Sequence, residues 1–232
     1  MLDKLTERAL SALFPPTCIL CGAPGHAGLD LCRGCLADLP RNRPCCERCA
    51  LPLTEGAAGL CGECLRAPPP FARCRAAFRY EDPIPALVSG VKFHARLNLA
   101  RVLGACLARS LEDLDERPGV IIPLPLHPSR LRERGYNQSL ELARPVSRAL
   151  GIPIDARCCA RSRATAPQVG LEMAARRRNV RGAFEVLRPP QAEHVVLLDD
   201  VVTTGSTVTE LTRALLRAGV ARVEIWAVAR TP

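Results

Sequence analysis

The fold follows from one stretch of the 232-residue sequence, Val195-Val-Leu-Leu-Asp-Asp-Val-Val-Thr-Thr-Gly-Ser-Thr207. Its apolar beginning is typical of a buried strand, and the strand ends in two adjacent carboxylates. A loop of small hydroxyl residues around Gly205 follows and opens a helix. Backbone N–H groups at the start of a helix bind anions, and the helix dipole adds to the attraction. The order of strand, acids and loop therefore predicts an α/β fold with an anion site at the end of the strand.

The acids beside the loop narrow the expected ligand. Asp199 and Asp200 would repel an isolated anion, but they are placed to accept hydrogen bonds from sugar hydroxyls or to lie near a bound magnesium ion. We therefore expect a sugar phosphate. The residues expected to bind its phosphate are Thr203, Thr204, Gly205, Ser206 and Thr207. Other phosphate motifs do not occur, because the sequence has neither a Gly-x-Gly-x-x-Gly after a strand nor the Gly-Lys-Ser/Thr of a P-loop.

Alternating strands and helices surround this stretch. Short apolar runs predict buried strands at residues 120–122, 195–198 and 223–228. Helices are expected at residues 140–150 and 208–218. Pro145 is expected to kink or shorten the first of them, because proline lacks the N–H that a helix interior needs. The alternation predicts a parallel sheet with helices on both faces.

The composition changes near residue 70. Nine of the thirteen cysteines lie between Cys18 and Cys64, in a segment poor in long hydrophobic runs. This segment ends in Ala67-Pro-Pro-Pro70, a stiff stretch that suits a linker. We therefore expect four parts: an N-terminal helix over 1–13, a cysteine module over 14–67, a linker over 68–74 and the α/β domain over 75–232.

Eight of these cysteines form four Cys-x-x-Cys pairs, namely Cys18 with Cys21, Cys32 with Cys35, Cys46 with Cys49, and Cys61 with Cys64. Both sulfurs of a pair reach one tetrahedral zinc ion, and two pairs complete its four ligands. The pairs therefore predict two structural zinc ions. Sequential pairing, first with second and third with fourth, is the simplest arrangement, but the spacing also allows an interleaved one. Disulfides are the main competing interpretation, and they require an oxidising compartment.

The charge balance favours anionic partners. Lys and Arg outnumber Asp and Glu by 32 to 23, a formal net charge of +9. Each zinc ion bound by four thiolates carries a net −2, so two such sites lower the total by 4, to about +5. This excess suits nucleotides, pyrophosphate or nucleic acid, although a basic surface also serves solubility. No apolar run approaches the ~18 residues of a membrane span, and residues 1–14 lack the apolar core of a secretory signal, so we expect a cytoplasmic protein.

The strand, acids and loop resemble the motif with which type I phosphoribosyltransferases bind 5-phosphoribosyl 1-pyrophosphate (PRPP). Further segments narrow the resemblance to the ComF family, in which a double zinc ribbon precedes a phosphoribosyltransferase domain. These segments are Lys92-Phe-His94, Pro123-Leu-Pro-Leu-His-Pro-Ser-Arg130, Arg134-Gly-Tyr-Asn-Gln-Ser139, Arg161-Ser-Arg-Ala-Thr-Ala-Pro-Gln168, Arg176-Arg-Arg-Asn179 and Gly182-Ala-Phe184. The resemblance implies that Asp199 and Asp200 hold the ribose 2- and 3-hydroxyls and that the loop holds the 5-phosphate.

The resemblance also implies roles for several cationic residues. Arg130 and Arg134 follow the strand at 120–122, whose loop approaches the pyrophosphate, and guanidinium binds phosphate oxygens in a bidentate way. Lys92 is implied as a further PRPP contact. The tip of the implied mobile lid contains Arg161, Arg163, Thr165 and Gln168. We take Arg130, Arg134 and Arg163 as catalytic candidates, while each also fits an ordinary solvated surface arginine.

The resemblance implies a protein that binds PRPP or ribose 5-phosphate with magnesium and takes part in DNA uptake or handling during natural transformation. Single-stranded DNA and the DNA-uptake machinery are the implied partners. The expected DNA contact is the stretch 157–188, which has eight arginines against two acids. Two alternatives stay open, a nucleobase phosphoribosyltransferase of nucleotide salvage and a PRPP sensor without turnover. A nucleobase phosphoribosyltransferase has a hood, a segment that recognises the base, and no segment of this sequence identifies one. The sequence therefore does not decide whether the protein turns over as a glycosyltransferase.

Overall fold

The computed structural model describes residues 15–114, 116–163 and 180–232. The chain forms two compact units, Met1–Leu39 and Pro40–Pro232. The helix expected over 1–13 lies outside the described residues, as do Thr165 and Gln168 of the expected lid. None of the helices in the described residues combines the length and the apolar character that a membrane crossing requires.

The first unit is a small cysteine-rich fold held by backbone turns. Cys18 N donates to Ala23 O at 2.7 Å, and Ile19 N donates to Asp30 O at 2.9 Å. The short helix α2 (Arg33–Asp38) begins after Cys32, whose Sγ accepts a hydrogen bond from Cys35 N at 3.3 Å. A cysteine that caps a helix in this way keeps both sulfurs of its pair on the same side of the turn.

The second unit is built on a parallel sheet with the strand order β1–β6–β5–β2. Its strands are β1 (Arg73–Arg79), β2 (Val120–Pro123), β5 (His194–Val202) and β6 (Arg222–Arg230). The strands expected at 120–122, 195–198 and 223–228 are β2, β5 and β6, so the predicted parallel sheet is confirmed. β1 is a further strand that the sequence did not indicate, because three arginines interrupt its apolar pattern.

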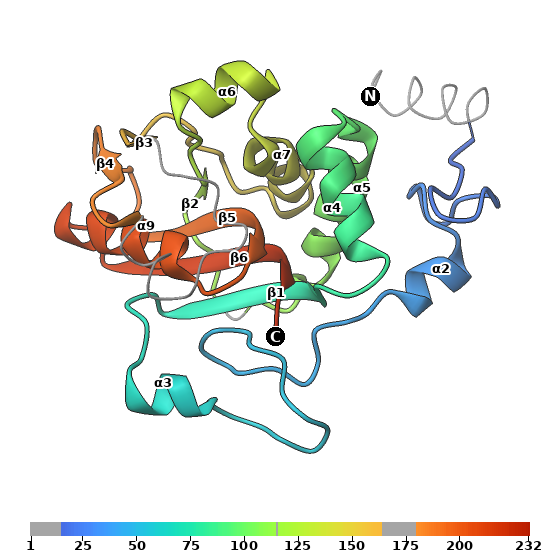
Figure 1. The fold of residues 1–232 in the computed structure, drawn as a ribbon, viewed down its shortest axis with the longest axis horizontal. Helices are drawn as coiled ribbons and strands as arrows, with labels where there is room; N and C mark the ends of the chain where they lie inside the picture. The colour runs from blue at the N-terminus through green and yellow to red at the C-terminus, as the bar shows by residue number, and fades with distance from the viewer. Residues whose placement is uncertain (1–14, 115, 164–179) are drawn as a thin grey trace. The chain divides into compact units, whose positions relative to one another are not determined.

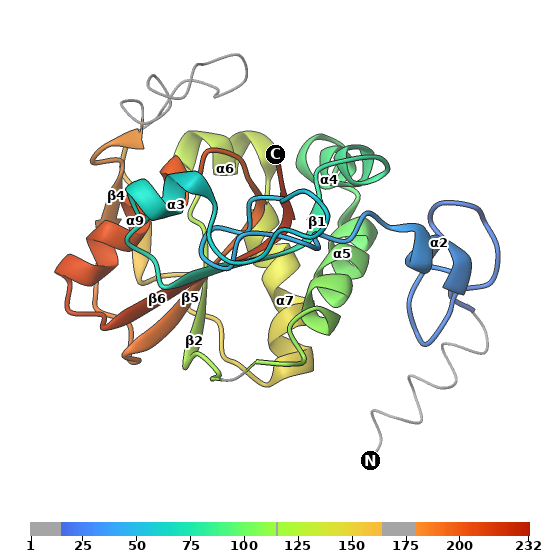
Figure 2. The same cartoon turned by 90° about the horizontal axis from the view of Figure 1, so that it is seen from below.

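Helices cover both faces of this sheet (Figures 1 and 2). On one face α5 (Leu97–Arg109) packs against β1, β6 and α7 (Gln138–Leu150), and α4 (Ile84–Phe93) packs on α5. On the other face α9 (Ser206–Arg217) shares a hydrophobic core with Leu197 of β5 and Ile225 of β6. The helices expected at 140–150 and 208–218 are α7 and α9. α7 continues through Pro145 to Leu150.

Three smaller elements lie outside this parallel sheet. The short helix α6 (Pro128–Arg134) follows β2 and ends at Gly135. The strands β3 (Cys159–Arg161) and β4 (Phe184–Val186) pair antiparallel, with Arg161 opposite Phe184. In the sequence, β3 precedes and β4 follows residues 164–179, which are outside the described part of the chain.

The turn that carries the third Cys-x-x-Cys pair, Cys46 and Cys49, is part of the hydrophobic core of the second unit. Ala50, directly after the third Cys-x-x-Cys pair, is fully buried in the hydrophobic cluster that contains Leu211 of α9 and Val223 of β6. The turn is also held by hydrogen bonds, from Asn42 Nδ2 to Ala50 O at 2.9 Å and from Cys74 N to Arg48 O at 2.8 Å. The helix α3 (Gly62–Arg66) carries the fourth pair's second cysteine. The metal-binding turn and the sheet therefore fold as one body.

A glycine allows α5 and α7 to approach closely. A Cβ atom added at Gly104 of α5 would lie 2.6 Å from Leu142 O of α7 and would also touch the ring of Pro145. Both neighbours are rigid, one being backbone and the other a proline ring. Pro145 is thus tolerated inside α7 at the point where its ring packs against the glycine surface of α5.

We predict that Gly104→Ala lowers the stability of the second unit by roughly 1–3 kcal/mol, because the added methyl has no space between these helices. Thermal unfolding measures the loss. Gly62→Ala in α3 is the matched control, since nothing lies within 4 Å of its added Cβ. Equal melting temperatures for the two variants would show that the α5–α7 contact is not close packed.

Candidate functional site

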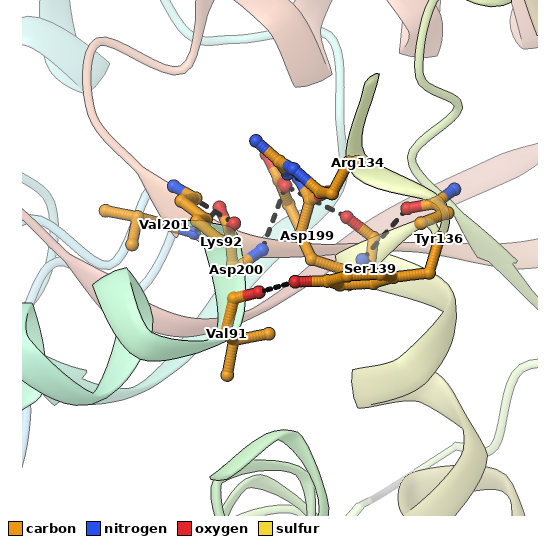
Figure 3. A network of polar contacts seen from close by, with 10 residues as sticks. Val91, Lys92, Arg134, Tyr136, Ser139, Asp199, Asp200 and Val201 are labelled. Atoms are coloured by element: carbon orange, nitrogen blue, oxygen red, sulfur yellow. Dashed lines mark hydrogen bonds and ion pairs between the residues drawn. The ribbon is translucent and has the colours of Figure 1, made fainter. Parts of the chain in front are cut away.

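The two predicted acids lie at the carboxyl end of β5, where ligands of open parallel sheets bind. Asp199 and Asp200 are both buried, with 8% and 4% of their surface exposed. Adjacent carboxylates at this depth repel each other and lose hydration, so they require partners. The structure supplies partners from three separate segments of the chain (Figure 3).

Each acid has its own set of partners. Asp199 Oδ1 accepts hydrogen bonds from Ser139 Oγ at 3.3 Å and from the backbone N–H of Asp200 at 2.9 Å. Asp200 Oδ1 accepts one from Val201 N at 2.7 Å, and its Oδ2 lies 3.0 Å from Lys92 Nζ. Lys92 reaches this position from the last turn of α4. The pair is therefore clamped between α4, α7 and its own strand.

The surroundings shift the pKa of both Asp199 and Lys92 upward, for different reasons. Burial, with the neighbouring charge of Asp200 as the next cause, raises the pKa of Asp199 to about 7, although Lys92 opposes the shift. Burial alone would lower the pKa of Lys92, but the charges of Asp200 and Asp199 outweigh it, so the pKa of Lys92 is raised. Lys92 is thus a firm cation beside Asp200, while Asp199 titrates near neutral pH.

The predicted phosphate loop joins β5 to α9. Gly205 has φ 71°, a left-handed conformation that side-chain-bearing residues rarely adopt, and α9 begins at the next residue. Thr204 Oγ1 and Ser206 Oγ lie 2.8 Å apart and share a hydrogen bond. Thr209 N donates to Gly205 O at 2.9 Å, which fixes the first turn of α9. Thr203 and Thr207 flank this turn, so the five expected residues lie together at the start of α9, a position whose backbone N–H groups suit an anion.

A cavity of about 200 Å³ opens beside Lys92. The residues that line it are Lys92, Phe93, His94, Ala95, Arg130, Glu133, Arg134 and Tyr136. Arg134 donates to Gln138 Oε1, and its guanidinium lies 5.7 Å from the centre of the exposed Phe93 ring. Tyr136 OH donates to Val91 O and ties α4 to the segment before α7. The structure therefore brings Lys92, Arg130 and Arg134 together at one cationic cavity.

Arg130 also has a partner within α6, whereas Arg161 and Arg163 lie on the β3–β4 pair and the residues that follow β3. Arg130 Nη1 lies 3.9 Å from Glu133 Oε2 in the same turn of α6. Arg163 Nη2 donates to Arg181 O at 2.8 Å across the ends of the β3–β4 pair. Arg161, half-buried, lies over the Phe184 ring at 5.5 Å. Burial lowers the pKa of Arg161, and the charge of Asp199 opposes this shift.

The eight predicted zinc ligands form two clusters. One contains Cys18, Cys21, Cys32 and Cys35, the other Cys46, Cys49, Cys61 and Cys64, and in each the four Sγ atoms lie within 4.8 Å of one another. Cys21 Sγ and Cys32 Sγ are 3.7 Å apart, as are Cys49 Sγ and Cys61 Sγ. A tetrahedral zinc ion with bonds of ~2.3 Å requires sulfurs about 3.8 Å apart, so both clusters fit zinc. The pairing is sequential.

Comparisons with known proteins agree with this geometry. The chain matches the family described as a double zinc ribbon domain over residues 9–65 and the one described as a phosphoribosyl transferase domain over residues 137–232. It is 40% identical over 227 residues to DNA utilization protein YhgH of Escherichia coli O157:H7, covering 94% of this chain and 98% of that protein.

Two further relatives extend the comparison. The protein of the same name in Salmonella typhimurium is 38% identical over 226 residues, covering 94% of this chain and 98% of the relative. Competence protein F of Haemophilus influenzae is 32% identical over 222 residues, covering 92% of this chain and 96% of the relative. The chain belongs to the ComF family. A zinc ribbon module followed by a phosphoribosyltransferase-type sheet is confirmed for this ComF protein.

Two residues beside the acid pair of this ComF protein were not singled out from the sequence. Ser139 lies next to Asp199, and Asn137 holds the start of α7 by accepting from Ser139 N at 2.9 Å and donating to Leu124 O at 3.1 Å. Both belong to the segment Arg134-Gly-Tyr-Asn-Gln-Ser139, and its polar residues directly before a helix are the signal that could have identified them.

We predict about two zinc ions per chain by metal analysis, one for each cysteine cluster. The double variant Cys21→Ser with Cys32→Ser removes two ligands from a single cluster and should leave about one zinc ion bound. Cys21→Ser with Cys49→Ser removes one ligand from each cluster and should lower both occupancies. The reverse result, with the first variant losing both ions and the second only one, would mean that the pairs interleave.

We also predict an unusual pH dependence from Asp199. Its folded pKa of about 7 exceeds the usual 3.8, so the folded protein binds more protons between these values and its stability falls as pH rises from about 4 to about 7. Asp199→Asn should therefore stabilise the ligand-free protein at pH 8, on the order of 1–3 kcal/mol, and flatten this descent. Thermal unfolding across pH measures both effects. Asp113→Asn, at an exposed acid, is the control, and matching curves for the two variants would contradict the prediction.

Proposed function

We propose that this ComF protein binds PRPP or a related ribose 5-phosphate together with magnesium. The observation that supports this most strongly is the buried acid pair beside an anion loop at the carboxyl end of one strand. A ligand with a phosphate and adjacent hydroxyls satisfies both parts, because its hydroxyls donate to the acids while its phosphate accepts from the loop. A simple anion would satisfy only the loop.

In this proposal the five loop residues hold the 5-phosphate and the acids hold the ribose. Hydroxyls of Thr203, Thr204, Ser206 and Thr207 and the backbone around Gly205 donate to the phosphate. Asp199 and Asp200 accept from the ribose hydroxyls. Such donors favour the charged carboxylate, so ligand binding lowers the pKa of Asp199 from its raised value.

The cationic cavity holds the pyrophosphate end. Arg130 and Arg134 bind its oxygens, and Lys92 turns from Asp200 toward the same charge when the ribose takes over the carboxylate. Arg163 is the lid candidate. If a base nitrogen attacks the anomeric carbon, the bond to pyrophosphate breaks and these cations stabilise the negative charge that it carries away. Magnesium bound with the pyrophosphate would share this charge, and the acid pair offers the oxygen donors that this ion prefers.

The names of the relatives support a role with DNA. Proteins named for DNA utilization and for competence share almost the whole length of this chain. We therefore place it in DNA uptake or handling in the cytoplasm during natural transformation, with single-stranded DNA or the DNA-uptake machinery as partner. Among the described residues of the stretch 157–188, Arg157 and Arg181 are exposed cations that suit a polyanion, and residues 164–179 lie outside the described part.

One set of binding measurements tests the proposal. PRPP with magnesium, at about 100-fold its Kd, should raise the melting temperature by roughly 5 °C or more. Asp200→Asn should remove this increase, whatever its own melting temperature, and Asp113→Asn should retain it. No increase for the unaltered protein would contradict ribose phosphate binding.

Binding of single-stranded DNA distinguishes the DNA role from the two alternatives, a PRPP sensor and a salvage enzyme. The affinity of the protein for single-stranded DNA should fall by roughly 0.7 log units per tenfold increase in salt for each phosphate neutralised, whereas its affinity for PRPP should change far less. PRPP binding without DNA binding at low salt would instead favour a PRPP sensor, or a salvage enzyme if a nucleobase is turned over.

A further inference from the structure

A buried arginine joins the phosphate loop to the second zinc cluster. Arg230 is the last residue of β6 and only 8% exposed. Its Nη1 donates to Thr203 O and, at 3.3 Å, to Val202 O, while its Nε donates to Cys49 O at 3.2 Å. Nη1 also donates to Thr231 O at 2.7 Å. One side chain thus bridges the end of β5, the end of β6 and a zinc-binding turn.

The contacts on the loop fix the direction of its N–H groups. The peptide units here are trans, so the C=O of one residue and the N–H of the next point in opposite directions. When Arg230 holds the carbonyls of Val202 and Thr203, the N–H groups of Thr203 and Thr204 must point away from the guanidinium. These N–H groups belong to the loop whose donors bind an anion. Arg230 therefore sets the orientation of two of them before any ligand arrives.

The contact on the zinc side is equally firm. Cys49 supplies its carbonyl to Arg230 and its Sγ to the second cluster, 3.7 Å from Cys61 Sγ. The next residue, Ala50, is fully buried in the core, and Asn42 Nδ2 holds its carbonyl at 2.9 Å. The carbonyl that anchors Arg230 is consequently fixed by metal ligation on one side and by core packing on the other.

The charge of Arg230 also suits an anion site. The oxygens that accept its hydrogen bonds are carbonyls and the Thr231 hydroxyl, at 3.4 Å, rather than carboxylates. Negative charge on this side comes from the zinc cluster of Cys49, which carries a net −2 when four thiolates bind the ion. A phosphate bound at the loop adds to the negative charge around this guanidinium.

We propose that Arg230 is a positioning residue that couples the second zinc ribbon to the phosphate loop, so that this ribbon forms the rear wall of the ribose phosphate site. The inference rests on the proposed function for the identity of the ligand, but the coupling itself is a property of the ligand-free protein. It gives the second ribbon a task beyond replacing a small hydrophobic core: the metal holds the Cys49 turn, the turn holds Arg230, and Arg230 holds the loop.

The ligand-free test is backbone ¹⁵N relaxation of the loop amides. In the unaltered protein, Thr203, Thr204 and Gly205 should be rigid, with order parameters near 0.85. Arg230→Met keeps the length of the side chain but removes its donors, and these order parameters should fall below about 0.6. Arg222→Met, at the other end of the same strand, is the matched control and should leave the loop rigid. A loop that stays rigid in Arg230→Met overturns the proposal.

Residues 195–198 in the middle of β5 serve as the internal reference for folding. If Arg230→Met also lowers the order parameters of residues 195–198, the same measurement is made on Arg230→Lys, which keeps the charge. In Arg230→Lys, a fall that is confined to the loop supports the proposal. A rigid loop, or a fall in residues 195–198 as well, overturns it. Cys61→Ser tests the zinc side, because it removes a ligand and leaves Cys49 in place. It should loosen the loop while residues 195–198 stay rigid, and an unaffected loop in protein that has lost this zinc ion overturns the coupling.

Calorimetry with PRPP and magnesium tests the consequence for binding. Arg230→Met should raise the Kd about tenfold or more, and Arg222→Met should leave it unchanged. An unchanged Kd in Arg230→Met contradicts the proposed role in binding. If the unaltered protein binds no PRPP, the proposed function fails, and the relaxation measurements still decide whether Arg230 and the zinc turn hold the loop.

Discussion

Two adjacent carboxylates forced into the carboxyl end of a buried parallel strand are the constraint on which the rest of this structure depends. Neither Asp199 nor Asp200 can move away, because β5 lies between β2 and β6 in the sheet. The protein relieves the repulsion by placing Lys92 beside one acid and by raising the pKa of the other to about 7. Both are incomplete solutions in the absence of a ligand. In the function proposed above, a ribose hydroxyl completes them, and for this reason the proposal favours a sugar phosphate over a simple anion.

The two zinc clusters have the same ligands but different surroundings. The first lies in its own compact unit, with Leu31 and Leu39 among its few buried apolar residues. The second shares a hydrophobic core with the sheet through Ala50 and reaches the phosphate loop through Arg230. In the coupling that we propose, metal ligation in this second cluster closes a turn with little core of its own and also fixes the Cys49 carbonyl that holds Arg230.

The parts of the site that are local in sequence could be predicted, and the parts that depend on packing could not. Strand, acids and anion loop follow one another directly between residues 195 and 207, and the zinc ligands are set by short spacings. Their sequential pairing needed the structure, since the spacing alone allowed two arrangements. Ser139 reaches Asp199 from 60 residues away along the chain, and Arg230 reaches Cys49 from 181 residues away. A basic residue at the end of a strand carries no local sign of such a contact.

The carboxyl resonance of Asp199, followed against pH with and without ribose 5-phosphate and magnesium, tests the central claim most directly. The account predicts a midpoint at about 7 in the ligand-free protein and a clear downward movement when ligand hydroxyls donate to the carboxylate. A midpoint near the ordinary value for aspartate in the free protein, or one that does not move at millimolar ligand, would contradict the claim that this acid pair binds the ribose.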